Sequence, residues 1–263
     1  MAQIHVVVGA GGPTGGPYMW AILDVIEAHT GWRHEDATTI IGTSAGAFLT
    51  AHAEPQEVPN ESGHLGALEL FRSAENSARW TARPSDFVVT AIRRLIGIGI
   101  AAVAPLGREQ AEYGVPEAPY HPGARVVAVR RRGKRIAPHL VGEADPVALV
   151  RASAAIPFVN GPIEIDGAWH VDGAVCSPTN ADLIEAESGD VVVVLAPMVP
   201  QSGGSISSRA HRAMLRVELA PAIRRGASVL VVAPTPAAHK RRKDREFFTE
   251  YGKKQILELV QNC

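Results

Sequence analysis

Two glycine-rich segments are the places in this sequence where chemistry is most readily located. The first reads VVVGAGGPTGG over residues 6–16 and runs from an apolar stretch directly into glycines. Backbone N–H groups at such a strand-to-helix junction face anions well, because a helix N-terminus carries unpaired donors and partial positive charge. The segment therefore fits two kinds of site, one for a dinucleotide pyrophosphate and one for the oxyanion formed when a serine attacks an ester.

The second segment, GTSAG, fits the turn that presents a nucleophilic serine. It follows the β-branched residues 38–41 and precedes a helix-like stretch, which is the setting of G-x-S-x-G in serine hydrolases. Gly42 and Gly46 suit a crowded turn, and the helix dipole would stabilise negative charge at Ser44. An alternative is that Ser44 only caps the helix, but a cap does not explain the two flanking glycines.

A serine hydroxyl needs a base to take its proton, and the histidines late in the chain are poor candidates. His211 lies in a helix-like stretch and His239 lies beside a basic run. We expect both to be exposed helix or tail residues. The base is therefore sought among the carboxylates.

A better candidate base lies within residues 152–182. This region predicts a helix end, then a short hairpin that reverses at Asp166-Gly167, a favoured hairpin turn. Asp172 instead ends a strand and enters a loop, and Gly173 beside it permits a close backbone approach. On local sequence Asp172 is either a site carboxylate or the residue that starts an Asx turn, and both readings stay open.

The composition is that of an ordinary globular protein and does not favour nucleic-acid binding. The chain has 263 residues, a net charge of −1, 46% hydrophobic residues and 20% charged residues. Basic runs at 130–135 and 239–245 are interpreted as solvated turns, with attraction of an anionic substrate or lipid surface as the alternative. Cys176 and Cys263 are too few for a disulfide framework or a metal site. Because the first residues lack the basic region of a signal peptide, we expect a cytoplasmic protein, either free or peripheral to a membrane.

Strand-like and helix-like stretches alternate along the chain. The β-branched runs predict strands at 4–8, 38–41, 124–129, 191–196 and 228–233, and several of these are continuously apolar, as in buried parallel strands. Helices are predicted at 16–29, 45–53, 65–79, 146–154, 179–187, 206–225 and 244–261. This order predicts an α/β fold with three α/β/α layers and a mainly parallel central sheet. We expect one domain over residues 1–263.

Two segments interrupt the alternation. Residues 52–64 are polar and contain prolines, which predicts a loop. Residues 80–123 carry five prolines and are interpreted as an insertion or lid segment on the scaffold. Within it, the apolar stretch 87–104 predicts either a lid or interfacial helix or a buried helix that closes the site.

Taken together, these motifs resemble those of the patatin-like phospholipases. The resemblance covers residues 4–196 and includes the first glycine segment, GTSAG, and ASAAIPFV…EIDGAWHVDGAV…PTNAD in the same order. It implies a lipid acyl hydrolase with a Ser–Asp dyad and no catalytic histidine, cofactor or metal. Ser44 would be the nucleophile, and Asp172 would be the base that deprotonates it and later activates water.

The resemblance also assigns the residues that would stabilise the oxyanion. It places donors at the backbone N–H groups of Gly11 and Gly12, and Ala45 in the turn is a further donor. Gly15 and Gly173 would support the backbone around the site. His170 shares a strand face with Asp172 but is interpreted as a partly buried strand residue. Cys176, Pro178 and Asn180 are assigned packing or structural roles.

Two departures from the family pattern affect this site. The family usually has G-G-G-x-R-G where residues 10–15 read AGGPTG. Pro13 has no N–H to donate, and Thr14 stands where arginine is usual, so this segment brings no positive charge. Ala174 replaces a common glycine after Asp172-Gly173, a change that requires a negative φ.

The predicted function is hydrolysis of ester bonds in phospholipids, lysophospholipids or glycerides through an acyl-Ser44 intermediate, with a lipid or acyl-ester substrate and peripheral membrane contact. A non-catalytic lipid-binding protein on the same scaffold is an alternative, because Pro13 and Thr14 are unusual. A dinucleotide-binding oxidoreductase is a weaker alternative. It needs an acidic residue after the second strand, whereas Glu35 and Asp36 precede that strand.

Overall fold

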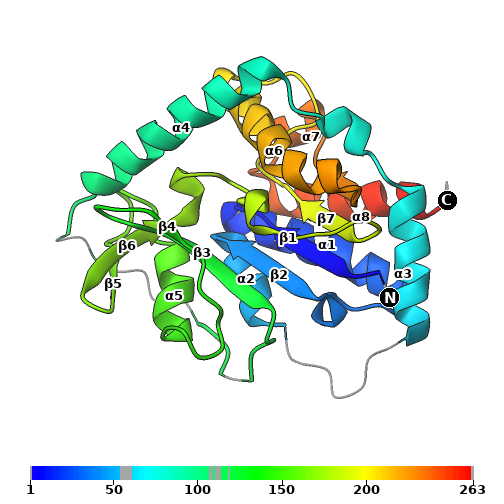
Figure 1. Cartoon of the computed structure of the whole chain (residues 1–263), viewed down its shortest axis with the longest axis horizontal. Helices are drawn as coiled ribbons and strands as arrows, with labels where there is room; N and C mark the ends of the chain where they lie inside the picture. The colour runs from blue at the N-terminus through cyan, green and yellow to red at the C-terminus, as the bar shows by residue number, and fades with distance from the viewer. Residues whose placement is uncertain (1, 54–60, 107–108, 110–113, 118, 262–263) are drawn as a thin grey trace.

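A mostly parallel sheet forms the centre of the molecule (Figure 1). The computed structural model describes residues 2–53, 61–106, 109, 114–117 and 119–261. Among these residues the sheet has eight strands in the order β5-β6-β3-β2-β1-β7-β8, with β4 paired to β3. Five neighbouring strands run parallel, as predicted: β1 (Ile4–Val8), β2 (Thr39–Thr43), β3 (Ala124–Arg130), β7 (Val191–Leu195) and β8 (Ser228–Val232).

The apolar character of the central strands follows from burial on both faces. All five residues of β1 and of β7 are buried. Side chains alternate between two cores: Val191, Val193 and Leu195 face one, and Val192 and Val194 face the other. Continuous valine runs are therefore required here, since neither face of the sheet meets solvent.

The remaining strands form an antiparallel extension beside β3. β4 (Arg135–Ile136) and β6 (Ala168–Asp172) both pair with β3, and β5 (Ile163–Ile165) pairs with β6. The predicted hairpin is confirmed. Asp166 and Gly167 form its turn with φ of +49° and +71°, the left-handed conformation that a two-residue type I′ turn requires at both positions.

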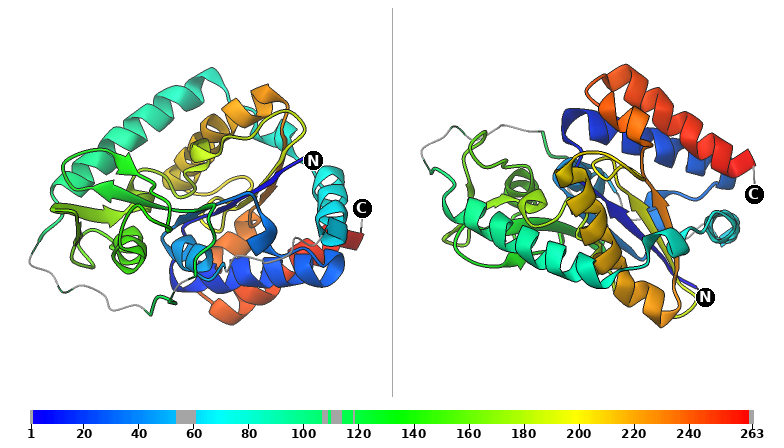
Figure 2. Two further views of the ribbon diagram at one scale, coloured as in Figure 1. Left: turned by 60° about the horizontal axis from the view of Figure 1, so that its bottom comes forward. Right: turned by 90° about the horizontal axis from the view of Figure 1, so that it is seen from above.

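Helices cover both faces of the sheet, which gives a mixed α/β fold consistent with three layers. On one face lie α1 (Gly12–Thr30), α2 (Ala45–Ala51), α3 (Glu61–Ser73), α5 (Pro146–Ser153) and α8 (Arg245–Gln261). On the other lie α4 (Pro84–Ala102) and α6 (Ile206–Arg225), which pack side by side (Figure 2). The short α7 (Pro236–Lys240) follows β8. Among the described residues, no helix is both long and apolar enough to cross a bilayer.

Two helices begin four residues earlier than predicted. α1 begins at Gly12 instead of residue 16, because Pro13 is well accommodated in a first helical turn. The helix predicted over 65–79 runs from Glu61 to Ser73, so the end of the predicted loop 52–64 is helical, and residues 54–60 of that loop lie outside the described residues. Asn76 stops the helix by exchanging hydrogen bonds with the backbone of Val231 in β8.

The prediction of a helix at 179–187 is wrong. Only a single 3₁₀ turn, Ala181–Leu183, forms there. Asn180 adopts a left-handed conformation with φ of 53°, and the buried carboxylate of Glu218 accepts hydrogen bonds from the Thr179 hydroxyl and the Ala181 N–H. These long-range contacts replace the intrahelical ones.

Helix α4 is fastened to the molecule along its inner side. Arg216 of α6 makes two hydrogen bonds to Asp86, with distances of 2.7 and 2.8 Å. Arg94 pairs with Asp182 and with buried Glu218. Gly97 lies so close to the η3 turn (Gly173–Val175) that a Cβ there would stand 1.8 Å from the carbonyl oxygen of Val175. The prediction of a buried helix is wrong for its outer face, which is exposed.

Candidate active site

Ser44 occupies a strained turn between β2 and α2. Its φ and ψ are 55° and −117°, a region that costs a non-glycine residue about 1–3 kcal/mol. The flanking glycines are sterically required: a Cβ on Gly46 would lie 1.9 Å from the Val8 carbonyl oxygen, and one on Gly42 would lie 2.3 Å from the Thr50 hydroxyl. The sequence GTSAG therefore forms a sharp strand-to-helix turn that lifts one serine out of the sheet.

Ser44 and Asp172, predicted separately from distant motifs, are in direct contact. The Ser44 hydroxyl donates a 2.8 Å hydrogen bond to Oδ2 of Asp172, and both residues are buried. Oδ1 of Asp172 accepts a 2.8 Å bond from the Ala174 N–H. Asp172 thus forms an Asx turn and also faces the serine, so the two readings left open by the sequence are both realised.

The backbone around Asp172 explains its neighbours. A Cβ on Gly173 would lie 2.5 Å from the carbonyl oxygen of Val127 in β3, so only glycine fits. Ala174 does not have a positive φ. Alanine can therefore stand where the family pattern commonly has glycine. The Asp172 N–H donates to the Ala155 carbonyl at 2.9 Å, which holds the end of β6 against the segment after α5.

Burial raises the pKa of Asp172 to about 7, and the hydrogen bonds from the Ala174 N–H and the Ser44 hydroxyl oppose this rise. A fully hydrated carboxylate is a weak base. With a pKa near neutrality, Asp172 is matched to accepting a proton from a hydroxyl at ordinary pH. The geometry and the protonation equilibrium therefore both suit a general base.

The first glycine segment forms the opposite wall of the site at the N-terminus of α1. Ala10, Gly11, Gly12 and Thr14 line the same cavity as Ser44 and Asp172. Among the described residues, no backbone group accepts a hydrogen bond from the N–H of Gly11, Gly12 or Ala45, as expected for donors at helix starts. These are the three donors predicted for an oxyanion hole.

Steric constraints show why this wall is glycine-rich. A Cβ on Gly11 would lie 2.5 Å from the Cα of Gly15, whose N–H donates to the Gly11 carbonyl at 3.0 Å. Gly12 has φ of +59°, a conformation that favours glycine. Pro13 follows at the second helical position, where a missing N–H breaks no helical bond.

Sequence reasoning missed Ser153 as a functional residue. Its hydroxyl accepts a 2.9 Å hydrogen bond from the Ser44 N–H and donates a 2.7 Å bond to the Val127 carbonyl. Ser153 thus holds the strained backbone of Ser44 against β3. The segment RASAAIP contains it, but nothing in the local pattern indicates that its partner lies 109 residues earlier.

The serine turn is also supported at Thr43, the residue before Ser44. Asn180 donates to the Thr43 hydroxyl at 3.1 Å, and Arg135 donates to the Asn180 side-chain oxygen at 2.9 Å. Arg135 also makes two hydrogen bonds to Asp182, so this member of the 130–135 run is not in a solvated turn.

The Pro178 carbonyl accepts a 2.7 Å bond from the Ala10 N–H. The structural roles predicted for Pro178 and Asn180 are therefore confirmed, and Cys176 packs in the core as expected.

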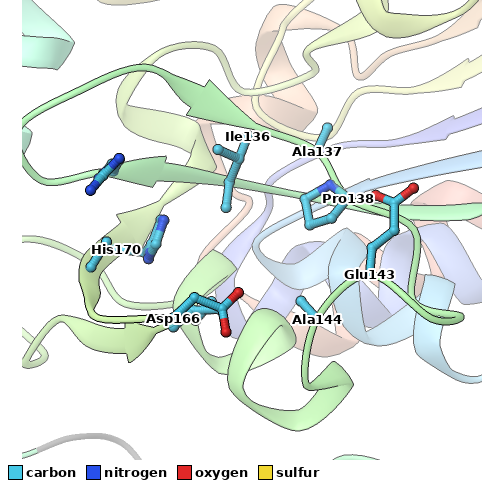
Figure 3. Close-up of a pocket in the computed structure, with 10 residues that line it drawn as sticks. Ile136, Ala137, Pro138, Glu143, Ala144, Asp166 and His170 are labelled. Atoms are coloured by element: carbon cyan, nitrogen blue, oxygen red, sulfur yellow. The ribbon is translucent and has the colours of Figure 1, made fainter.

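His170 lies apart from the dyad. Figure 3 shows it lining a different cavity together with Ile136, Pro138, Glu143 and Asp166. It is buried, as expected of a strand histidine, and burial lowers its pKa. No hydrogen bond joins it to Ser44 or Asp172 in the described part of the chain.

The expectation that His211 and His239 are exposed is wrong. His239 is buried, His211 is half-buried, and desolvation lowers the pKa of each to about 4, so both are neutral at pH 7. They line a neighbouring cavity that shares Met198 and Arg242 with the cavity of Ser44. Residues of α7 and of the start of α6 line this cavity together, an arrangement that composition does not reveal.

The Ser44 cavity has a volume of about 470 Å³ and combines an apolar wall with basic groups. Its apolar lining comes from Ile100, Ile156, Pro157, Val175 and Met198. Arg93, Arg242 and Lys243 supply the basic groups. Two residues of the 239–245 run, Arg242 and Lys243, therefore line the cavity of Ser44.

The surroundings of β2 do not fit a dinucleotide site. Glu35 lies in a 3₁₀ turn (His34–Asp36) before β2, where it is buried against Arg33 and His34. The residue that follows β2 is Ser44. The position where an acidic residue would bind a ribose hydroxyl is thus occupied by the serine turn.

We predict that Asp172→Asn stabilises the protein at pH 8. The carboxyl has a pKa of about 7 when folded against an ordinary value of 3.8, so its contribution to stability is full below about pH 4 and is lost as pH rises through 7. The amide avoids a buried charge: its oxygen can accept from the Ala174 N–H, and its NH2 group can donate to the Ser44 oxygen, which reverses the direction of that hydrogen bond. Urea unfolding should show a higher midpoint for the variant at pH 8 and a much smaller difference at pH 5.

Asp24→Asn is the matched control, since Asp24 is exposed on α1. It should leave the midpoint nearly unchanged at both pH values. A difference between Asp172→Asn and the parent that does not vary with pH would contradict a buried carboxylate titrating near 7.

Comparisons with known proteins show little similarity. No protein-family model and no curated protein matches the chain. Among solved structures, the chain is similar to VipD from Legionella pneumophila, with a TM-score of 0.41 and 10% sequence identity. The alignment covers 99% of this chain and 66% of that one, so the chain spans less than two thirds of VipD. A similarity at this level establishes neither a shared fold nor a shared activity.

Proposed function

We propose that this protein is a serine acyl hydrolase with a patatin-like fold that cleaves ester bonds of lipids. The observation that carries the proposal is the 2.8 Å hydrogen bond from the hydroxyl of Ser44 to the carboxylate of Asp172 inside a cavity with an apolar wall. The order and residues of the motifs, which resemble those of patatin-like phospholipases, support the same conclusion.

The first half-reaction forms an acyl-enzyme. The Ser44 oxygen attacks the ester carbonyl carbon while its proton passes to Oδ2 of Asp172. The negative oxygen of the tetrahedral intermediate faces the N–H groups of Gly11, Gly12 and Ala45. Donors of this kind are worth roughly 2.7–4 kcal/mol each in other acyl-transfer enzymes. When the intermediate collapses, the alcohol leaves with the proton from Asp172.

The second half-reaction regenerates the serine. A water molecule attacks the acyl carbonyl, and Asp172 takes its proton. Collapse of this second intermediate releases the carboxylic acid and returns the proton to the Ser44 oxygen. One carboxylate thus serves both steps, and the mechanism uses no histidine.

The apolar wall favours a fatty acyl chain over a small acyl group. Ile100, Ile156 and Met198 are aliphatic or thioether side chains at the same cavity as Ser44. Burial of each methylene group of a substrate contributes about 0.8 kcal/mol. We expect kcat/KM to rise with acyl chain length until the cavity is filled.

The outer face of α4 supports contact with a lipid surface. Every exposed residue from 87 to 103 is apolar or glycine, and Leu95 and Val103 are 69% and 64% exposed. The exposed side chains Phe158 and Val159 follow Ile156 and Pro157 of the cavity wall. A contiguous apolar face of this kind is unusual on a soluble monomer and is typical of interfacial helices. The proposal is that this face rests on a bilayer and feeds the cavity.

The dyad is tested with a fluorophosphonate probe and an ester panel that varies in chain length and head group. The parent protein should be labelled and should hydrolyse esters. Ser44→Ala should abolish labelling, and Asp172→Asn should lower hydrolysis at least a hundredfold, because the hydroxyl loses its base. Circular dichroism shows whether each variant is folded. A folded parent that neither reacts with the probe nor cleaves any ester would favour the non-catalytic lipid-binding alternative.

The pH dependence follows from the same carboxylate. Asp172 acts as a base only when ionised, and its pKa is about 7. We expect kcat/KM to rise with pH, reach half its maximum at about pH 7, and level off above pH 8. Stopped assays on a neutral short-chain ester at a series of pH values measure this rise in kcat/KM. A midpoint near 4 would show that the ordinary carboxyl pKa applies and would contradict the role of burial.

Membrane contact is tested by substitution on the outer face of α4. Ile92→Glu with Leu95→Glu should reduce co-sedimentation with phosphatidylglycerol–phosphatidylcholine vesicles at least tenfold, because two charges would enter the interface. Hydrolysis of a dissolved short-chain ester should persist. Leu257→Glu is the matched control, since Leu257 is an exposed apolar residue on α8. Equal binding by all three proteins would rule out this face as the contact.

A further inference from the structure

Three basic side chains from two distant segments meet at the Ser44 cavity. Arg93 comes from α4, whereas Arg242 and Lys243 come from the turn after α7. They meet because α4 packs beside α6, and α7 follows the carboxyl end of β8 at the same sheet edge as the serine turn. None of them belongs to the motifs that define the dyad.

These cations have no carboxylate partner in the part of the chain that the structure describes. Neighbouring arginines differ in this respect: Arg94 pairs with Asp182 and Glu218, and Arg241 pairs with Asp244. The acidic residue that lines the cavity is Asp172, and its two oxygens are bound by Ser44 and Ala174. The positive charge at the cavity is therefore uncompensated by the protein.

One of the cations is also held in place. The guanidinium of Arg242 donates a 3.0 Å hydrogen bond to the His239 carbonyl, and its side chain is half-buried. Among the residues that the structure describes, no further hydrogen-bond partner faces its remaining N–H groups, so they are available to an anion. A guanidinium presents several donors in a plane that matches the oxygens of a phosphate.

The positive charge at this cavity also affects the pKa values of two nearby histidines, His211 and His239. Desolvation is the largest cause of the lowered pKa of His211 and of His239, and the charges of Arg93 on His211 and of Arg242 on both add to it. Because both histidines are neutral at pH 7, the arginines and Lys243 supply the positive charge of this wall.

We infer that Arg93, Arg242 and Lys243 form a subsite for a net-anionic phosphate head group on the ester that Ser44 attacks. This inference rests on the proposed acyl hydrolase function and adds its head-group preference. The charge that is missing at Thr14 is thus supplied from α4 and from the turn after α7. A phosphate monoester carries a net charge of up to −2, whereas a phosphocholine group is neutral overall. The subsite therefore favours lysophosphatidate-type esters over lysophosphatidylcholine-type esters.

The experiment compares three dissolved hexanoyl esters that share one acyl linkage: hexanoyl glycerol, its 3-phosphate and its 3-phosphocholine. The parent should show at least a tenfold higher kcat/KM for the 3-phosphate than for the 3-phosphocholine. Arg93→Gln combined with Arg242→Gln should lower that ratio at least tenfold. The ratio should also fall when ionic strength is raised, since salt screens exposed charges.

Arg132→Gln is the matched control. It removes one positive charge from an exposed residue of the other basic run, and the ratio should stay unchanged. Arg93→Lys with Arg242→Lys should restore most of the ratio, which a loss of packing alone would not allow.

Two outcomes separate failure of the subsite from failure of the proposed function. Equal kcat/KM for the 3-phosphate and the 3-phosphocholine, with hexanoyl glycerol still cleaved, would overturn the subsite alone. If no ester is cleaved, calorimetry with Ser44→Ala measures binding directly. The 3-phosphate should then bind at least tenfold more tightly than the 3-phosphocholine, and the double Gln variant should lose this difference; equal binding overturns the inference.

Discussion

The hydrogen bond between the Ser44 hydroxyl and the Asp172 carboxylate is the interaction on which the rest of the site depends. It requires a serine in a backbone conformation that costs free energy and a carboxylate withdrawn from water, and both are unfavourable on their own. The surrounding structure offsets these costs with backbone packing at glycines, with the hydrogen bond that the Ser44 N–H donates to Ser153, and with the one that Asp172 accepts from the Ala174 N–H. The site is thus a locally unfavourable arrangement maintained by a well-packed sheet.

The parallel sheet explains how such distant residues gather. The first glycine segment, the serine turn, Met198 and the turn after α7 follow β1, β2, β7 and β8. Because parallel strands end at one edge, the loops that follow them meet there. Asp172 arrives from the antiparallel extension, and its position opposite Ala128 of β3 brings it beside the serine turn. The cavity is therefore built from both the parallel and the antiparallel parts of the sheet.

Much of this arrangement could be predicted from the sequence. Continuous valine runs identified the parallel strands, and the glycines of GTSAG identified the serine turn, because both signals are local. The residues that were missed depend on contacts across the chain. The role of Ser153 requires knowing that the end of α5 lies against β3 and the serine turn, and the break at Asn76 requires knowing that β8 offers it backbone partners. The same applies to Arg242 and Lys243, whose neighbours are set by the packing of α7 and not by their own segment.

The attachment of α4 has a consequence for how the cavity would operate over a catalytic cycle. The buried or half-buried ion pairs of Asp86 and Arg94 and the close approach at Gly97 hold this helix in one position. A hinged cover would have to break these contacts in every turnover, which would make opening slow and dependent on a lipid–water boundary. A helix fixed in this way leaves the entrance permanently formed. Turnover would then vary smoothly with substrate concentration, without the abrupt acceleration at the onset of micelle formation that marks enzymes with a displaceable cover.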